Sequence, residues 1–166
     1  MRPVVLACSL LALGLGGSGL ASRAEASPEP RLPATAPTDT SGRPQIVLDY
    51  LDFPSDVPGA SHFKKDLRTI LYREVRRARW GAGSGSTITY RFFVTKLTLR
   101  THGDVLQVTC HAFGQLPKGK TAKSTLTFSG SARERNAVVR RVLEIVARGV
   151  ITRLAELERV RRGDLE

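Results

Sequence analysis

The stretch from residue 87 to residue 129 decides the fold, and it reads TITYRFFVTKLTLR at 87–100, VLQVTCHAF at 105–113 and AKSTLTFS at 122–129. All three segments are rich in Thr, Val, Phe, Tyr and Leu, which are the residue types that favour strands. Turn residues separate the segments. The pattern predicts three consecutive strands that pair antiparallel.

The first of these segments changes its alternation partway along. Apolar residues occupy every second position over 88–94, but Leu97 and Leu99 lie on the opposite parity. We expect a β-bulge near Thr95–Lys96, because one extra residue would return both leucines to the core face. In the third segment, Phe128 is expected on the core face.

A helix is predicted on either side of the three strands. From Ser61 to Ala78 apolar residues recur at helical spacing. The opposite face of this helix carries basic residues and one tyrosine, namely Lys65, Arg68, Tyr72, Arg76 and Arg79. Glycines within 81–85 are expected to end it.

The last helix is predicted from a capping box at Ser131–Glu134, in which the serine oxygen accepts an early backbone N–H. Its apolar stripe runs over 138–150 and includes Gly149, where the missing side chain would let the helix approach the sheet. Beyond Ile151 the stripe weakens, so this end is expected to overhang the sheet. Its opposite face carries three arginines, Arg140, Arg141 and Arg148.

A compact apolar run at Gln45–Leu51 precedes the first helix and is interpreted as a buried strand. The predicted order is therefore strand, helix, three strands, helix. This order indicates an α+β fold with a four-stranded, largely antiparallel sheet and both helices on one face. We place a single domain at 45–160 and a short tail at 161–166.

The amino-terminal region predicts export. Residues 1–26 have an early positive charge, an apolar run and a small-x-small motif at Ala24–Ala26, which together are typical of a cleaved signal peptide. A lipidated cysteine would lie at the end of the apolar run, whereas Cys8 lies inside it. Residues 27–44 are proline-rich and predict a disordered linker. We expect a periplasmic or secreted protein with no transmembrane segment after cleavage.

Charge and cysteine content limit the possible partners. The chain has a formal net charge of +11, which favours polyanions. Outside the cytoplasm the available polyanions are phospholipid head groups, lipopolysaccharide and acidic wall polymers. Nucleic acid is not expected as a partner. After loss of Cys8 only Cys110 remains, so no internal disulfide is possible.

Residues 114–121 read GQLPKGKT and match the phosphate-loop pattern G-x-x-x-x-G-K-T. A phosphate loop needs a helix directly after it, so that helix N–H groups face the phosphates. The segment after Thr121 has the composition of a strand. Residues 114–121 are therefore predicted to form a basic hairpin loop that carries Lys118 and Lys120 and binds no nucleotide.

Other chemistry is weakly represented. The three histidines, His62, His102 and His111, lack metal-ligand spacing, so no metal or other cofactor is expected. Cys110 has the core-facing parity of its strand. Three carboxylates, at Asp49, Asp52 and Asp56, lie near the end of the first strand and could act as general acids and bases in a small secreted enzyme, although turn and cap roles are simpler.

The order of elements resembles a known family. The run Ile46–Tyr50 leading into a loop and helix, then Tyr90–Leu99, the Gly103–Asp104 turn into Val105–Val108, and a helix after Ser131 are similar to envelope domains of the TolB amino-terminal type, which include CsgG-like and LpoB-like lipoproteins. The resemblance covers Gln45 to about Leu157. It implies a non-enzymatic role in docking to another envelope protein or in an export or wall-assembly machine.

These observations predict an exported, non-enzymatic binding or assembly module of the bacterial envelope, which contacts another envelope protein or an anionic surface. The candidate contact residues are the basic helix faces and the loop lysines. They are Lys65, Arg68, Tyr72, Arg76, Arg79, Lys118, Lys120, Arg140, Arg141 and Arg148. Two alternatives stay open: a small secreted enzyme that uses the carboxylates near the first strand, or a purely electrostatic binder of lipopolysaccharide or anionic lipid.

Overall fold

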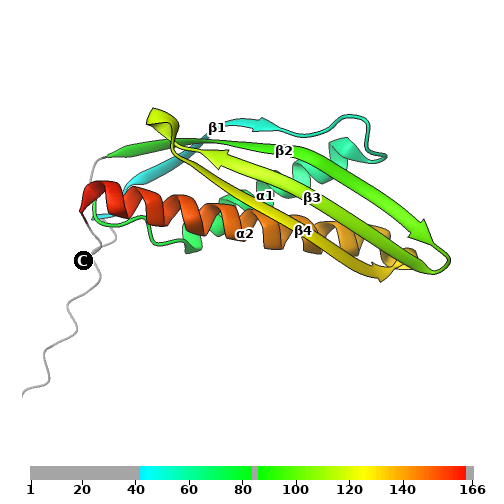
Figure 1. The fold of residues 1–166 in the computed structure, drawn as a ribbon. Helices are drawn as coiled ribbons and strands as arrows, with labels where there is room; N and C mark the ends of the chain where they lie inside the picture. Colours follow the sequence, from blue (N-terminus) through cyan, green and yellow to red (C-terminus); the bar gives the residue numbers. More distant parts are fainter. Residues whose placement is uncertain (1–41, 84–85, 164–166) are drawn as a thin grey trace, which may run out of the picture. The chain divides into compact units, whose positions relative to one another are not determined.

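The computed structural model describes residues 42–83 and 86–163. Along the chain it contains strand β1 (Gln45–Asp52), helix α1 (Ala60–Arg77), strands β2 (Thr87–His102) and β3 (Val105–Gln115), the short 3-10 turn η2 (Pro117–Gly119), strand β4 (Thr121–Ser131), the 3-10 turn η3 (Ala132–Glu134) and helix α2 (Arg135–Arg162) (Figure 1). The predicted α+β class and the predicted element order are confirmed. The predicted signal peptide, and the linker up to residue 41, lie outside the described residues.

The four strands form one sheet in the order β1-β2-β3-β4. β2, β3 and β4 pair antiparallel, as the turn residues between them predict. β1 instead pairs parallel to β2, so the sheet is mixed. Because parallel strands need a long crossover, α1 provides the connection between β1 and β2.

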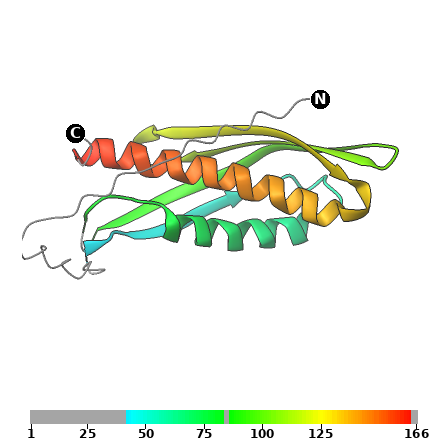
Figure 2. The same ribbon diagram turned by 90° about the horizontal axis from the view of Figure 1, so that it is seen from below.

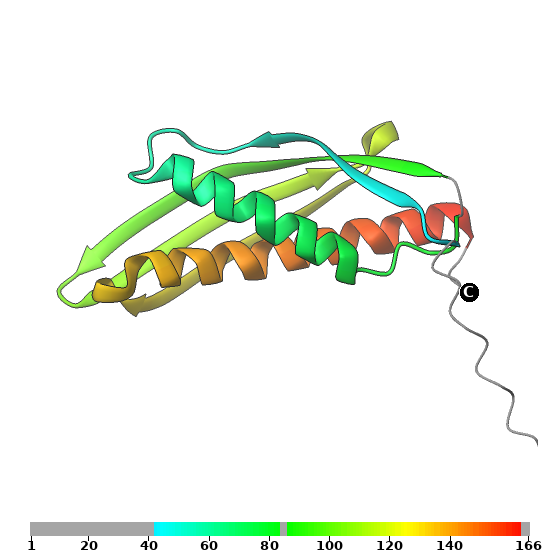
Figure 3. The same ribbon diagram turned by 180° about the vertical axis from the view of Figure 1, so that it is seen from behind.

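Both helices cover the same face of the sheet, as predicted (Figures 2 and 3). The core between the layers is built from alternate residues of β2 and β3 and from the inner faces of α1 and α2. Among its fully buried members are Phe63, Leu71, Phe92, Val108, Val139 and Leu154. None of the helices in the described part of the chain is long and apolar enough to cross a membrane.

The predicted bulge is present, because the register between β2 and β3 shifts between Val94 and Lys96. Leu97 is therefore buried on the same face as Phe92. One strand prediction is wrong: β1 is not buried but is an edge strand with an exposed Tyr50. Phe128 lies on the predicted core face, since it pairs with the buried Val108, but it is 39% exposed because the helices cover the outer strand β4 only in part.

Both ends of helix α2 also differ from the prediction. Ser131 accepts a hydrogen bond from the Arg133 N–H at 3.3 Å, but it caps η3, and α2 begins at Arg135. α2 does not overhang the sheet, since its fully buried Leu154 packs beneath β3. Arg162, assigned to a tail, lies in the last turn of α2.

The close approach of α2 to the sheet occurs at two strand glycines and not at Gly149. A Cβ at Gly114 would lie 2.7 Å from both Val150 and Leu154, and one at Gly130 would lie 2.6 Å from Val138. A Cβ at Gly149 would make an ordinary contact of 3.4 Å with Ser124. The glycines that admit the helix are therefore in β3 and β4.

Candidate anion-binding cleft

A cleft of about 440 Å³ lies where the end of α1 meets the start of β1. Apolar side chains and exposed arginines share its lining. The lining residues are Arg43, Pro44, Ile46, Val75, Arg76, Ala78, Arg79, Trp80 and Gly81. We call this site the Arg43–Trp80 cleft.

The end of α1 positions the apolar part of the cleft. The chain becomes extended at Ala78, and Trp80 then turns back so that its indole Nε1 donates a hydrogen bond to the Val75 carbonyl at 3.0 Å. That bond satisfies a carbonyl that the end of the helix leaves free. The Trp80 ring is 5% exposed and tilted against Tyr90, with 6.5 Å between ring centroids. The cleft therefore has a fixed aromatic wall.

The segment before β1 completes the cleft. Gly42 accepts a hydrogen bond from the Gly83 N–H at 2.8 Å, which ties this segment to the loop after α1. Pro44 is buried, and Arg43 is exposed beside it. Residues 42–44, predicted as the end of a disordered linker, are therefore held against the domain.

Three arginines, Arg43, Arg76 and Arg79, line the cleft, and no lining residue is acidic. Within residues 42–83 and 86–163, no ion pair joins any of the three to a carboxylate. Arg76 lies in the last turn of α1, where the helix dipole favours a positive charge. Arg43 and Arg79 lie outside the helix, so the dipole alone does not account for the cluster.

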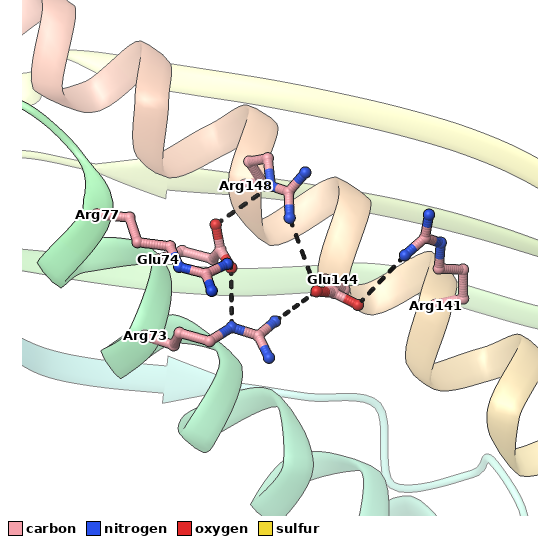
Figure 4. A network of polar contacts seen from close by, with 6 residues as sticks. All are labelled: Arg73, Glu74, Arg77, Arg141, Glu144 and Arg148. Carbon is pink, nitrogen blue, oxygen red and sulfur yellow. Dashed lines mark hydrogen bonds and ion pairs between the residues drawn. The ribbon is translucent and has the colours of Figure 1, made fainter.

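The arginines that lie between α1 and α2, unlike those of the cleft, form ion pairs with carboxylates of the protein. Glu74 of α1 is 3% exposed, and it accepts hydrogen bonds from Arg73 at 3.0 Å, Arg77 at 3.5 Å and Arg148 at 3.2 Å. A buried carboxylate needs such partners. Arg148 therefore joins α2 to α1 and is occupied by an internal ion pair (Figure 4).

Glu144 of α2 forms the second centre of this network. Arg73 donates to it at 2.6 Å, and the guanidinium groups of Arg148 and Arg141 lie 3.7 Å and 3.8 Å away. Arg141 and Arg148 were predicted to face a partner. Arg148 contributes to the contact between the helices through Glu74, whereas Arg141 pairs only with Glu144 of its own helix and its side chain stays 63% exposed (Figure 4).

The structure brings only part of the predicted set together. Lys65, Arg68, Tyr72 and Arg76 are exposed along one side of α1, as the helical spacing predicts, and Arg79 is exposed just beyond the end of the helix. A shallow hollow beside the cleft is bordered by Tyr72 and shares Arg76 with it. Arg140 is exposed on α2, away from this hollow and from the cleft.

The loop lysines occupy a separate place. Lys118 is exposed in η2 with a φ of +70° and lines two other clefts, one beside Asp49 and Arg91 and one beside Glu158. Thr121 begins β4, so the strand predicted after the G-x-x-x-x-G-K-T pattern is confirmed and no helix follows the loop. Lys120 is half-buried next to it.

Sequence reasoning missed two of the residues that define the cleft. Arg43 was assigned to the linker, and Trp80, which directly precedes the glycines at 81–85, was given no role in a site. A tryptophan directly after an amphipathic helix was the available signal, because the large ring needs a surface on which to be buried.

The candidate catalytic and metal-binding residues, namely the three carboxylates, Cys110 and the histidines, do not line the Arg43–Trp80 cleft. Asp49 pairs with Arg91 at 2.8 Å, and Asp52 and Asp56 are exposed. Cys110 is fully buried, and burial raises the pKa of its thiol to about 12. Over 42–83 and 86–163, no three His, Cys, Asp or Glu side chains gather closely enough to hold a metal ion.

No protein-family model and no curated protein matches the chain. Solved structures do match. A PelC dodecamer from Paraburkholderia phytofirmans has 15% identity and a TM-score of 0.44, with 72% of this chain and 91% of that chain covered. Lipoprotein GNA1162 from Neisseria meningitidis has 13% identity and a TM-score of 0.35, with 69% and 99% covered. A Xanthomonas campestris protein of the DUF330 family has 12% identity and a TM-score of 0.35, with 72% and 86% covered.

At these identities the likeness lies in the arrangement of helices and strands. None of the three is described as TolB amino-terminal, CsgG-like or LpoB-like, so the predicted family resemblance stays a prediction.

Proposed function

We propose that the chain is a non-enzymatic binding module of the bacterial envelope and that the Arg43–Trp80 cleft binds an anionic amphiphile. One observation carries the proposal: Arg43, Arg76 and Arg79, which have no carboxylate partner among the described residues, line the same cleft as Trp80.

The chemistry of the lining favours a particular class of ligand. Arginine recognises phosphate and carboxylate groups through two parallel N–H donors. Ile46, Val75 and Trp80 give the same cleft an apolar surface. An anion that carries acyl chains, such as an anionic phospholipid or lipopolysaccharide, presents both features at once.

The alternative of a purely electrostatic surface makes a different prediction. If only the net charge of +11 attracted the ligand, every exposed arginine would contribute alike, and binding would disappear at high salt. A cleft with an apolar wall retains part of its affinity at high salt, and the arginines that border it dominate.

Vesicle cosedimentation distinguishes these outcomes. A basic residue near an anionic membrane contributes about 1 kcal/mol, so Arg76→Gln with Arg79→Gln should weaken binding to phosphatidylglycerol vesicles about 30-fold. Arg100→Gln with Arg140→Gln is the matched control, because both arginines are exposed and neither forms an ion pair within the described residues. An equal loss in both double variants would contradict the proposal.

The enzymatic alternative rests on Asp49, Asp52 and Asp56. Asp49 pairs with Arg91 at 2.8 Å, and Asp52 and Asp56 are exposed to solvent. Binding without turnover is therefore the better supported proposal.

The proposed location is periplasmic or secreted, and it rests on the sequence of residues 1–26. Mass spectrometry of the protein purified from an expressing bacterium should find a mature amino terminus near Ser27. An intact Met1 in the soluble cytoplasmic fraction would contradict export.

A further inference from the structure

The two edges of the sheet differ in how they are protected against pairing with another chain. Free edges of sheets invite such pairing, and bulges, charges and prolines commonly prevent it. β1 has these devices: its register with β2 shifts between Leu48 and Tyr50, which leaves Asp49 out of the pairing, and Asp52 ends the strand.

β4, at the other edge, has none of these devices over most of its length. It runs for 11 residues and pairs with β3 in an unbroken register from Thr121 to Ser131. Residues 124–131 read STLTFSGS and contain no charge and no proline. From residue 124 to residue 131 the free side of β4 is therefore regular and uncharged, and no further strand lies beside it in the sheet (Figure 1).

Apolar side chains accompany this edge. Phe128 is 39% exposed, and Leu126 is only partly buried. On α2, Ile145 is 37% exposed. It lies between Val138, which packs at Gly130 of β4, and Gly149, which faces Ser124 of β4. Ile145 therefore belongs to the part of α2 that follows the β4 edge.

We propose that β4 pairs antiparallel with β4 of a second copy of this chain, which joins two sheets into one continuous sheet of eight strands. A two-fold symmetric contact requires a surface that is complementary to itself. The β4 edge meets this requirement when Thr127 lies on the symmetry axis.

The register around Thr127 explains why a second copy fits. Leu126 of one copy then faces Phe128 of the other, which places two apolar side chains in a cross-strand pair. Lys123, the one charged residue of β4, faces Ser131 of the other copy. The two Lys123 side chains are then separated by about 26 Å along the strands, so no like charges oppose each other.

This inference does not depend on the proposed function. The Arg43–Trp80 cleft lies at the start of β1, on the opposite edge of the sheet from β4. Pairing through β4 therefore leaves the cleft of each copy open. A dimer would present two clefts to one surface, which raises the overall affinity for a surface that displays many ligands.

Cysteine cross-linking tests both the contact and its register. Directly opposite residues in an antiparallel pair have Cβ atoms about 4.5–5.5 Å apart, so Thr127→Cys should form a disulfide-linked dimer on mild oxidation. Thr125→Cys is the matched control: it is exposed on the same face, but its two copies would lie about 13 Å apart along the strands, too far for a disulfide.

Light scattering on the purified wild-type protein supplies the second measurement. It should give about twice the monomer mass, and Thr127→Lys should reduce this to the monomer mass because two lysines would face each other. Thr89→Lys, which adds the same charge to an exposed position on β2, should remain dimeric. A monomeric wild type, or cross-linking through Thr125→Cys in place of Thr127→Cys, would overturn the proposal.

Discussion

Replacing a glycine by alanine should have opposite effects on stability at Gly114 and at Gly149. A Cβ on Gly114 would lie 2.7 Å from Val150 Cγ1 and from Leu154 Cδ1, whereas carbon atoms pack best at about 3.5–4.0 Å. Both neighbours are fully buried, so they cannot move aside freely. Overpacking costs about 1–3 kcal/mol, and the less flexible unfolded chain offsets about 0.4–1 kcal/mol of this. We expect Gly114→Ala to destabilise by about 1–2 kcal/mol.

At Gly149 the same change meets Ser124 Oγ at 3.4 Å, an ordinary contact. The residue lies inside α2, where alanine is preferred over glycine by about 1 kcal/mol. Gly149→Ala should therefore stabilise the protein by up to about 1 kcal/mol. Urea unfolding with an unchanged m-value measures both effects. A stable Gly114→Ala variant together with a destabilised Gly149→Ala variant would refute the packing of α2 described above.

Three further predictions concern buried polar groups. Glu74→Gln should lower the free energy of unfolding by about 1–2 kcal/mol in urea titrations. This is less than the loss of a fully buried ion pair would cost, because partners such as Arg148 stay half exposed. An unchanged urea midpoint would contradict this. Hydrogen bonds from Arg161 are the main reason why the pKa of Glu158 lies below its ordinary value of 4.5. The stability that this pKa shift provides is present above pH 4.5 and is lost as the pH falls through the folded-state pKa. The urea unfolding curves of the wild type and of Glu158→Gln should therefore converge in acid. A difference in stability that stays constant with pH would contradict this role of Glu158. Burial raises the pKa of Cys110 to about 12, so a thiol reagent at pH 8 should label Cys110 only at the rate of unfolding; immediate labelling of the folded protein would show that the thiol is accessible.

The strands and their sequence of elements were predictable because the local patterns were strong. The parity change at Leu97 indicated a bulge, and the structure has it at Thr95. The basic side of α1 followed from helical spacing alone. These features depend on residues that are close in the sequence.

Features that depend on distant residues were missed. The burial of Glu74 depends on Arg148, 74 residues away, so no local pattern shows that Arg148 is occupied. The role of Gly114 depends on Leu154 in another element. Gly149 was chosen because it interrupts an apolar stripe, but that stripe is rotated so that Gly149 lies at its exposed edge.

The candidate cleft was only half predictable for the same reason. Arg76 and Arg79 belong to the basic face that helical spacing predicts, although Arg79 lies just beyond the end of α1. Arg43 is held at the site by the hydrogen bond from the Gly83 N–H to the Gly42 carbonyl. That bond joins a proline-rich segment to a glycine-rich loop, and neither composition indicates the contact.

The most direct test of the proposed cleft uses Trp80, which lines it and is the one tryptophan of the chain. Its fluorescence should be titrated with a short-chain phosphatidylglycerol below its micelle concentration and with the matching phosphatidylcholine. We predict a saturable change in emission with the anionic lipid alone, and weaker binding by about 30-fold in the Arg76→Gln, Arg79→Gln variant. No change with either lipid, or the same curve for both, would contradict an anion-binding cleft at this site.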